Sequence, residues 1–398
     1  MVAGETIRDG IDEAAMLRET RAWAEINSGT GNLEGLAKVA AELADAFATL
    51  PGEVELVDPA PVTAIASDGT EFEKPHGRHL VLRVRPETDR RVILTGHMDT
   101  VFPVDHPFQS VEKLDAETIN GPGTADMKGG LNVILHALRA FENTPDAAKL
   151  GYDVMINSDE ETGSLASSAL IEELARGKYA ALTYEPSALP DGTLAHARGG
   201  TGNYSITIRG RSAHAGRNPE DGRNALVAAS DLVLRLTRLA AEDITVNPAK
   251  IEGGGANNVV PDLAILRFNI RPKTTDAMNR FDGQLDDLLA MLADDHDVQV
   301  HRHGGVTRPP KPVDERAQRL FDLVRDCGAQ LGQTIGWKPT GGVCDGNNIA
   351  ACGVPVVDTM GVRGGAIHSP DEFLIIPSLG ERAALSALVL ARLSTGDL

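Results

Sequence analysis

Over about the first 195 residues, short apolar runs alternate with segments of helical periodicity. The runs Arg91–Thr95, Asp153–Asn157 and Ala180–Tyr184 are compact and apolar, as is typical of strands buried on both faces. Between them, Gly130–Phe141 and Leu165–Leu174 have the spacing of helices. This alternation predicts an α/β fold in which helices cover a mixed, mostly parallel sheet.

The middle of the chain has a different pattern. Its predicted elements are a strand at 204–209, a helix at 224–239, strands at 244–252 and 262–271, a helix at 275–293 and a strand at 298–302. The order β-α-β-β-α-β is that of a ferredoxin-like α+β unit. After the proline-rich stretch 308–312, the earlier helix and strand patterns resume. We therefore predict a discontinuous catalytic domain, 1–197 and 307–398, with a domain inserted at 198–306.

Composition and charge exclude several classes of function. Of 398 residues, 38 are Lys or Arg and 57 are Asp or Glu, which gives a net charge of −19. Nucleic acids and anionic membranes bind clustered basic charge, so neither is an expected partner. The three cysteines include no CxxC pair, and no apolar run approaches the ~18 residues that span a bilayer. The first residues also lack the apolar stretch of a signal peptide, so the expected location is the cytoplasm.

Histidine and acidic residues cluster in five short segments, most of which directly follow a predicted strand. In the first, His97 and Asp99 are two residues apart, so an extended backbone points both side chains the same way. That arrangement suits a metal-bound imidazole oriented by a carboxylate. In the second, Asp126 lies in a glycine-rich turn before a helix, where a simple N-cap is the alternative. The nucleotide-binding patterns GxxxxGK[ST] and GxGxxG are absent, which disfavours a nucleotide-dependent enzyme.

The other three segments add carboxylates and a second imidazole. Glu160 and Glu161 are adjacent, so in extended backbone one can bind a metal while the other faces a reacting water, although a solvated acidic turn is equally compatible. Glu185 closes another apolar strand, and His368 follows almost two hundred residues later. Open α/β sheets place ligand sites at their strand ends. Oxygen and imidazole donors without thiolate suit Zn²⁺, with Mn²⁺ or Co²⁺ as alternatives, and their number fits two ions.

Several longer strings together resemble a known superfamily. They are GHMDTVFP (96–103), NGPGTADMKGG (120–130), NSDEETGS (157–164), YEPS (184–187), RGRSAHAG (209–216), GGGANNVVPD (253–262) and GAIHSPDE (365–372). In content and order they resemble the dinuclear zinc exopeptidases and deacylases, which include glutamate carboxypeptidase, aminoacylase, acetylornithine deacetylase and succinyl-diaminopimelate desuccinylase. The carboxypeptidase-like branch is the most similar.

The resemblance implies a role for each residue of the acidic segments. The implied metal ligands are His97, Asp126, Glu161, Glu185 and His368. Asp126 would bridge two metals, with His97 and Glu185 on one ion and Glu161 and His368 on the other. Asp99 would orient His97, and Glu160 would be the general base for a metal-activated water.

The resemblance also extends to the inserted segment, which serves in the family as a lid and for dimerisation. His214 would correspond to a histidine that reaches the active site of the neighbouring subunit. Asn258 and Arg271, and with less motif support Arg363, would contact substrate. A homodimer formed through the inserted domain is therefore expected.

These observations lead us to expect an amide hydrolase that releases a C-terminal amino acid, with glutamate as one candidate, from a peptide or N-acyl conjugate. A deacylase of the N-acyl-amino-acid or acetylornithine type is the alternative within the same class. A catalytically silent binding protein of the same fold is a remote alternative, because every catalytic position is filled.

Overall fold

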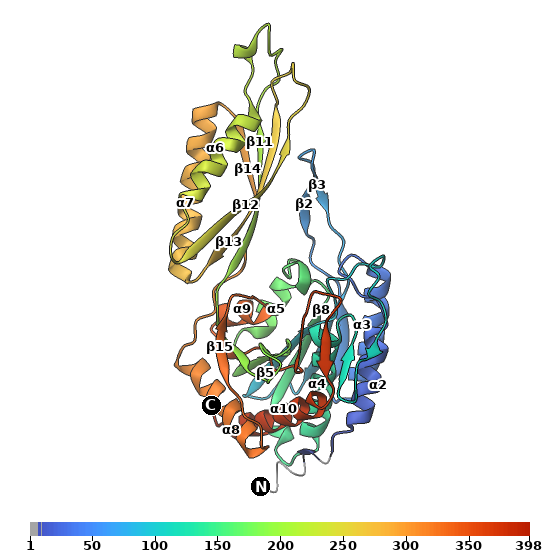
Figure 1. Ribbon diagram of the computed structural model, residues 1–398. Helices are drawn as coiled ribbons and strands as arrows, with labels where there is room; N and C mark the ends of the chain where they lie inside the picture. Colours follow the sequence, from blue (N-terminus) through green and yellow to red (C-terminus); the bar gives the residue numbers. More distant parts are fainter. Residues whose placement is uncertain (1–6, 9) are drawn as a thin grey trace. The chain divides into compact units, whose positions relative to one another are not determined.

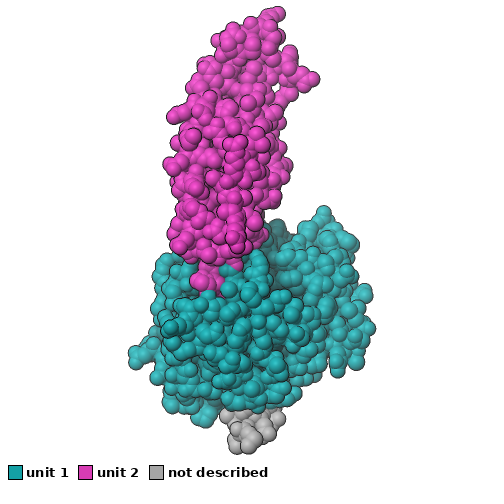
Figure 2. Space-filling view, turned by 60° about the vertical axis from the view of Figure 1, so that its left-hand side comes forward, with its two compact units in different colours: residues 1–60, 75–198, 313–398 teal, residues 61–74, 199–312 magenta. Residues whose placement is uncertain are grey.

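The computed structural model describes residues 7–8 and 10–398, and the chain forms two compact units, shown in Figure 2. The first comprises Met1–Ala60, Pro75–Arg198 and Val313–Leu398, and the second Pro61–Lys74 and Gly199–Pro312. The second unit therefore contains a short early segment in addition to the expected insertion. Such a contribution comes from contacts between residues far apart in sequence, which local periodicity does not reveal.

The first unit contains seven α-helices within its described residues. They are α2 (Glu13–Ala24), α3 (Leu33–Phe47), α4 (Gly129–Glu142), α5 (Ser168–Ala175), α8 (Glu315–Gln330), α9 (Asp345–Ala351) and α10 (Ser378–Thr395). Of these, α4 and α5 lie close to the two helices predicted by position. Helix α5 begins three residues later than its pattern indicates, after Ser164, whose φ is +55°. Within the described part of the chain, no helix is both long and apolar enough to cross a membrane.

The central sheet of the first unit is mixed and mostly parallel. Its strands, in spatial order, are β1 (Glu53–Val57), β4 (His79–Val84), β8 (Gly151–Asn157), β5 (Arg91–His97), β9 (Ala180–Thr183) and β16 (Val356–Val357). β8, β5, β9 and β16 run parallel to one another, whereas β4 is antiparallel to both β8 and the edge strand β1. The predicted α/β architecture is confirmed.

Both faces of this sheet are covered by helices (Figure 1). Val92 and Leu94 of β5 belong to the core shared with α2, α3, α4, α8 and α10. Ile93, between them, belongs to a second core shared with α5 and α9. Successive side chains of a strand thus pack into two apolar layers, which is why these strands are mostly apolar.

Two smaller sheets were not predicted from the sequence. One pairs β10 (Leu194–Arg198) with β15 (Trp337–Thr340) in parallel. The other has the order β17 (Gly364–Gly365), β18 (Phe373–Ile375), β7 (Thr118–Asn120), β6 (Glu112–Lys113). The second sheet joins the glycine-rich turn before α4 to the segment that carries His368, two regions about 250 residues apart.

The second unit has the predicted β-α-β-β-α-β order. Its elements are β11 (Thr201–Arg209), α6 (Ala225–Thr237), β12 (Ile244–Gly253), β13 (Leu263–Pro272), α7 (Thr275–His296) and β14 (Gln299–Arg308). The sheet order is β12-β13-β11-β14, antiparallel throughout, and α6 and α7 pack on one face. The short hairpin β2 (Thr63–Ile65) and β3 (Glu71–Glu73) joins this unit, because Arg267 and Arg209 donate hydrogen bonds to its Ile65 and Gly69 carbonyls at 2.7 and 2.9 Å.

Candidate metal centre

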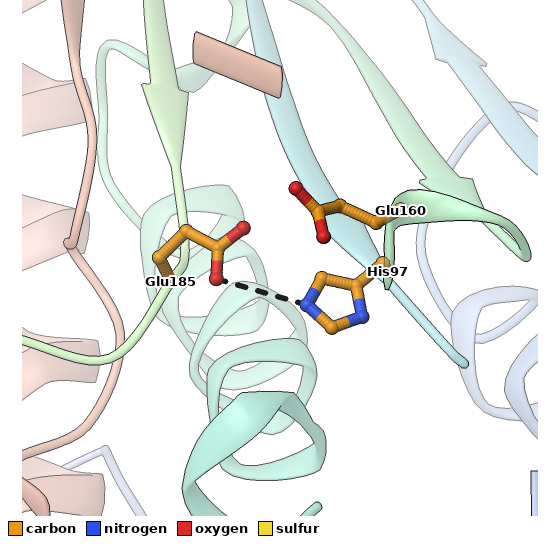
Figure 3. A group of neighbouring side chains, drawn as sticks. All are labelled: His97, Glu160 and Glu185. Atoms are coloured by element: carbon orange, nitrogen blue, oxygen red, sulfur yellow. Dashed lines mark ion pairs between the residues drawn. The ribbon is translucent and has the colours of Figure 1, made fainter. Parts of the chain in front are cut away.

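Three neighbouring parallel strands of the central sheet deliver the candidate ligands. His97 is the last residue of β5, Glu185 follows the end of β9 by two residues, and Glu160 and Glu161 follow β8. Since β8, β5 and β9 are adjacent and parallel, their carboxyl ends lie at one edge of the sheet. Figure 3 shows His97, Glu160 and Glu185 directed toward one another.

Asp126 lies between the two imidazoles. Its Oδ1 is 3.1 Å from Nε2 of His97, and its Oδ2 is 3.2 Å from Nε2 of His368. Each carboxylate oxygen therefore faces a different histidine, which is the arrangement of a ligand that bridges two ions. Asp126 lies in the irregular segment η1 (Thr124–Lys128), whose backbone departs from helical geometry at Asp126 and Met127.

A second carboxylate, besides that of Asp126, lies beside each imidazole. Glu161 Oε2 is 3.2 Å from His368 Nε2, and Glu185 Oε2 is 3.7 Å from His97 Nε2. Ligand atoms of His97, Asp126 and Glu161 lie within 4.8 Å of one another, as do those of His97, Glu160 and Glu185. Glu160, expected as the general base, is thus also close enough to act as a ligand.

Asp99 contacts both His97 and the backbone of the paired glutamates. The Nδ1 of His97 is 3.0 Å from the backbone oxygen of Asp99 and 3.4 Å from its Oδ1. The same carboxylate accepts hydrogen bonds from the backbone N–H groups of Glu160 and Glu161 at 3.1 and 3.2 Å and from the Thr30 hydroxyl at 2.7 Å. Asp99 therefore fixes both the histidine and the paired glutamates, which is more than orientation of one ring.

Glu372 is a functional residue that the sequence analysis did not single out. Its buried carboxylate accepts hydrogen bonds from the backbone N–H groups of Gly123, Ala125 and Asp126 at 3.1, 2.9 and 3.0 Å. Glu372 thereby anchors the turn that presents Asp126. Its position in the string GAIHSPDE, four residues after His368, was the available signal.

Lys128 is a second residue that was missed. It is fully buried, and its ammonium donates hydrogen bonds to the Met98 carbonyl and the Ser28 hydroxyl at 2.5 and 2.6 Å. Burial lowers the pKa of Lys128 to about 8, although the nearby carboxylates act in the opposite direction. The positive charge of the Lys128 ammonium partly offsets the negative charge of the nearby carboxylates.

The electrostatics of the cluster favour bound cations. Burial and the Asp126 carboxylate raise the pKa of Glu161 to about 7. Hydrogen bonds to Asp126 and Glu161 raise the pKa of His368 to about 11, and carboxylates outweigh burial to raise that of His97. Buried carboxylates that repel one another and converge on two imidazoles match the donor preference of Zn²⁺ and related ions. The residues present therefore fit a pair of divalent metals.

The cluster opens into a cavity of about 530 Å³ in the first unit. Asp126, Glu160, Glu161, Glu185 and His368 line one part of it, and apolar side chains such as Ile367 and Phe373 line another. A second hollow of about 460 Å³, lined by Val101 and Val104, shares Glu161 with the first. The cluster thus has space on two sides, as the two halves of an amide substrate require.

Arg363, one of the predicted substrate contacts, does not line this cavity. Arg363 donates hydrogen bonds from Nε to the Pro190 carbonyl at 3.0 Å and from Nη1 to Glu381 at 3.0 Å, and it lines a separate hollow. Nε and Nη1 of Arg363 are used in these contacts, and its contact with substrate stays a prediction. His214, Asn258 and Arg271 are exposed residues of the second unit, and their roles stay predictions.

The family model for peptidase family M20/M25/M40 matches residues 93–392. The chain belongs to this family. It is accordingly a metal-dependent hydrolase that cleaves amide bonds, as the sequence analysis predicted.

Curated relatives extend this similarity over most of the chain. Carboxypeptidase G2 from Pseudomonas sp. (strain RS-16) is 29% identical over 391 residues, which cover 97% of this chain and 91% of the relative. Succinyl-diaminopimelate desuccinylase from Xanthomonas oryzae pv. oryzae is 25% identical over 321 residues, covering 76% and 83%.

Solved structures show the same fold at lower identity. A tripeptidase from Staphylococcus aureus superposes with a TM-score of 0.72 at 24% identity, covering 97% of this chain and all of that one. An M20 metallo-carboxypeptidase from Sulfolobus solfataricus has a TM-score of 0.68 at 15% identity, covering 96% and 99%.

Proposed function

We propose that the protein is a dinuclear metallo-carboxypeptidase that releases a C-terminal amino acid from a peptide or N-acyl conjugate. The observation that carries this proposal is Asp126, whose two carboxylate oxygens each face a different imidazole. The ligand sets are His97, Asp126 and Glu185 for one ion and Asp126, Glu161 and His368 for the other. Zinc is the proposed metal, with cobalt and manganese as substitutes.

The side chains around this site divide the work of amide hydrolysis. Two bound cations would supply a water of lowered pKa and polarise the scissile carbonyl. Glu160 accepts the proton of the attacking water and delivers it to the leaving amine. Asp99 holds both the imidazole of His97 and the backbone of Glu160, so the base and the first ligand keep a fixed relation.

The second unit has a proposed role as lid and dimerisation domain. Its strand β12 is an edge strand of the four-stranded sheet, and an edge strand has unpaired backbone groups that can pair with a second copy. His214 is exposed, and its Nδ1 accepts a hydrogen bond from the backbone N–H of Gly216 at 3.1 Å. Its Nε2 can therefore act as a hydrogen-bond donor to another group. We propose that His214 completes the active site of the partner subunit and that Asn258 and Arg271 contact substrate.

A deacylase that removes an acyl group from an amino acid is the second candidate. The similarity to succinyl-diaminopimelate desuccinylases favours it. The two candidates differ in which half of the amide the cavity selects. The cavity near Glu161 extends to both sides of the cluster, so geometry favours neither half.

A hydrolysis screen of the zinc-loaded protein separates these candidates. One series of substrates varies the C-terminal residue under a constant acyl group, and the other varies the acyl group on a constant amino acid. A carboxypeptidase discriminates within the first series and tolerates the second, whereas a deacylase does the reverse. Absence of amide hydrolysis in both series would contradict the proposed function.

A further inference from the structure

Apart from His368, a proposed metal ligand, the cavity at the metal centre has two cationic side chains on its wall, Arg198 and Lys338. They lie on the paired strands β10 and β15, away from the ends of the central sheet that provide the metal ligands. Four carboxylates line the same cavity. A cation on this wall can bind an anionic group of the substrate if no carboxylate of the protein already neutralises it.

Arg198 is already neutralised. Its Nε and Nη2 donate to both carboxylate oxygens of Asp358 at 2.8 and 3.0 Å, and its Nη1 donates to the Gly342 carbonyl at 2.9 Å. The side chain is 7% exposed, and that of Asp358 is fully buried. This bidentate pair uses the donors of the guanidinium, so Arg198 serves to hold β10 against the loop that follows β15.

Lys338 is in the opposite situation. It is exposed, and none of the described residues forms an ion pair with it. Its strand neighbour in register is Ala195, which also lines the cavity and whose small side chain leaves space beside the lysine. Thr340, two residues further along β15, lines the cavity as well, as expected for side chains on one face of a strand.

The strand that carries Lys338 is fixed at both ends. Leu194 donates its backbone N–H to the Gly336 carbonyl at 2.8 Å before the lysine, and Arg198 contacts Gly342 after it. Groups mounted on a fixed strand bind with less loss of conformational freedom than groups on a loose loop. Lys338 is thus placed, and held, beside the reaction site without a partner of its own.

The charge balance indicates what that partner is. Two divalent ions carry +4, and the three ligand carboxylates together with Glu160 carry −4 before the water gives up its proton, so the metals leave no net positive charge for an anionic substrate. A substrate carboxylate remote from the scissile bond would lose its hydration without gaining a partner unless another cation received it. We propose that Lys338 is a specificity-determining residue that binds a carboxylate of the substrate outside the scissile amide. This inference rests on the proposed amidase function and deepens it, because it assigns the substrate to anionic N-acyl amino acids or peptides.

The test compares substrate pairs that differ by one charge and little in shape. The first pair is N-benzoyl-L-glutamate and N-benzoyl-L-glutamine, the second N-succinyl-L-alanine and N-succinamoyl-L-alanine, and the third N-benzoyl-L-alanine and its primary amide. They place the carboxylate on the side chain, the acyl group and the C-terminus respectively. The kcat/KM ratio within each pair measures the preference for the charge.

We expect wild type to prefer the carboxylate in one pair and Lys338→Gln to reduce that preference by about tenfold, between the effects typical of exposed and of buried ion pairs. Lys338→Glu should reverse it. The matched control is Lys38→Gln, because Lys38 is an exposed lysine of α3 paired with Glu34 and does not line the cavity. Dissociation constants of the uncleaved substrates, measured in a Glu160→Gln background, should show the same change.

An unchanged preference in all three pairs, or an equal loss of activity on charged and neutral members, would overturn the inference. In both cases the amidase function would stand, because hydrolysis itself is observed. If the wild-type protein cleaves none of the six compounds and the Glu160→Gln variant binds none of them, the result contradicts the proposed amidase function itself.

Discussion

The adjacent glutamates Glu160 and Glu161 make the sharpest test of the division of labour at the site. Both lie within ligand distance of other metal-binding groups, but their surroundings differ. The Glu161 side chain is 6% exposed and 3.2 Å from His368 Nε2, whereas Glu160 faces the cavity near His97 and Glu185. Substitution of each by glutamine preserves size and removes the charge and the proton-accepting oxygen.

For Glu160→Gln we expect both metals to remain and turnover to fall about 10²–10⁴-fold, the usual contribution of general base catalysis. That loss corresponds to about 2.7–5.4 kcal/mol in the activation barrier. Glu161→Gln removes a ligand, and even partners behind a ligand change metal affinity about 10–100-fold, so we expect at least that loss at one of the two ions.

The assay combines metal analysis after equilibrium dialysis with steady-state kinetics at saturating metal. Activity of Glu161→Gln should recover in part when zinc is raised, because its base is intact, and that of Glu160→Gln should not. The roles would be reversed if Glu160→Gln emptied a metal site while Glu161→Gln stayed fully loaded.

Three further predictions concern other parts of the molecule. Glu372→Ala leaves the N–H groups of Gly123, Ala125 and Asp126 without their buried acceptor. It should destabilise the protein by at least about 3 kcal/mol in denaturant unfolding, at a minimum of about 1 kcal/mol for each of the three groups. Asp371→Ala, at the exposed neighbour, is the control, and equal effects of the two would refute the anchoring role. Zinc at a hundred times its dissociation constant should stabilise the chelated protein by about 2.7 kcal/mol per site in thermal unfolding, and an unchanged melting temperature would contradict a metal centre built from these residues. Mixing inactive His214→Ala and Glu160→Gln proteins should restore activity in heterodimers, where one active site has both an intact base and an intact histidine; a mixture that exchanges subunits, shown by mass spectrometry, but stays inactive would refute the shared site.

Local sequence patterns predicted the strands at the centre of the main sheet and the helices and long strands of the second unit, because burial dictates their composition directly. β5, β8 and β9 are mostly apolar because their side chains alternate between two cores, and the amphipathic α6 and α7 cover one face of their sheet. The hairpin at 63–73 escaped prediction because its short strands are mostly exposed and have no apolar alternation.

The site was predictable to the extent that strand ends are. His97, Glu161 and Glu185 end or follow adjacent parallel strands, so their meeting follows from the fold class. Asp126 and His368 lie on segments joined by the small sheet β17-β18-β7-β6 and by long-range hydrogen bonds, and their approach to the strand ends was expected only from the family resemblance. Hydrogen bonds that fix these segments, such as those of Glu372, connect residues some 250 positions apart and have no local signature.

The central claim is that Asp126 bridges two metal ions. Anomalous diffraction at the zinc edge, from crystals of the zinc-loaded protein, tests it most directly. The account predicts two peaks about 3.5–4 Å apart, one on each side of the Asp126 carboxylate, with His97 at one and His368 at the other. A single peak, or two peaks that do not share Asp126, would contradict it.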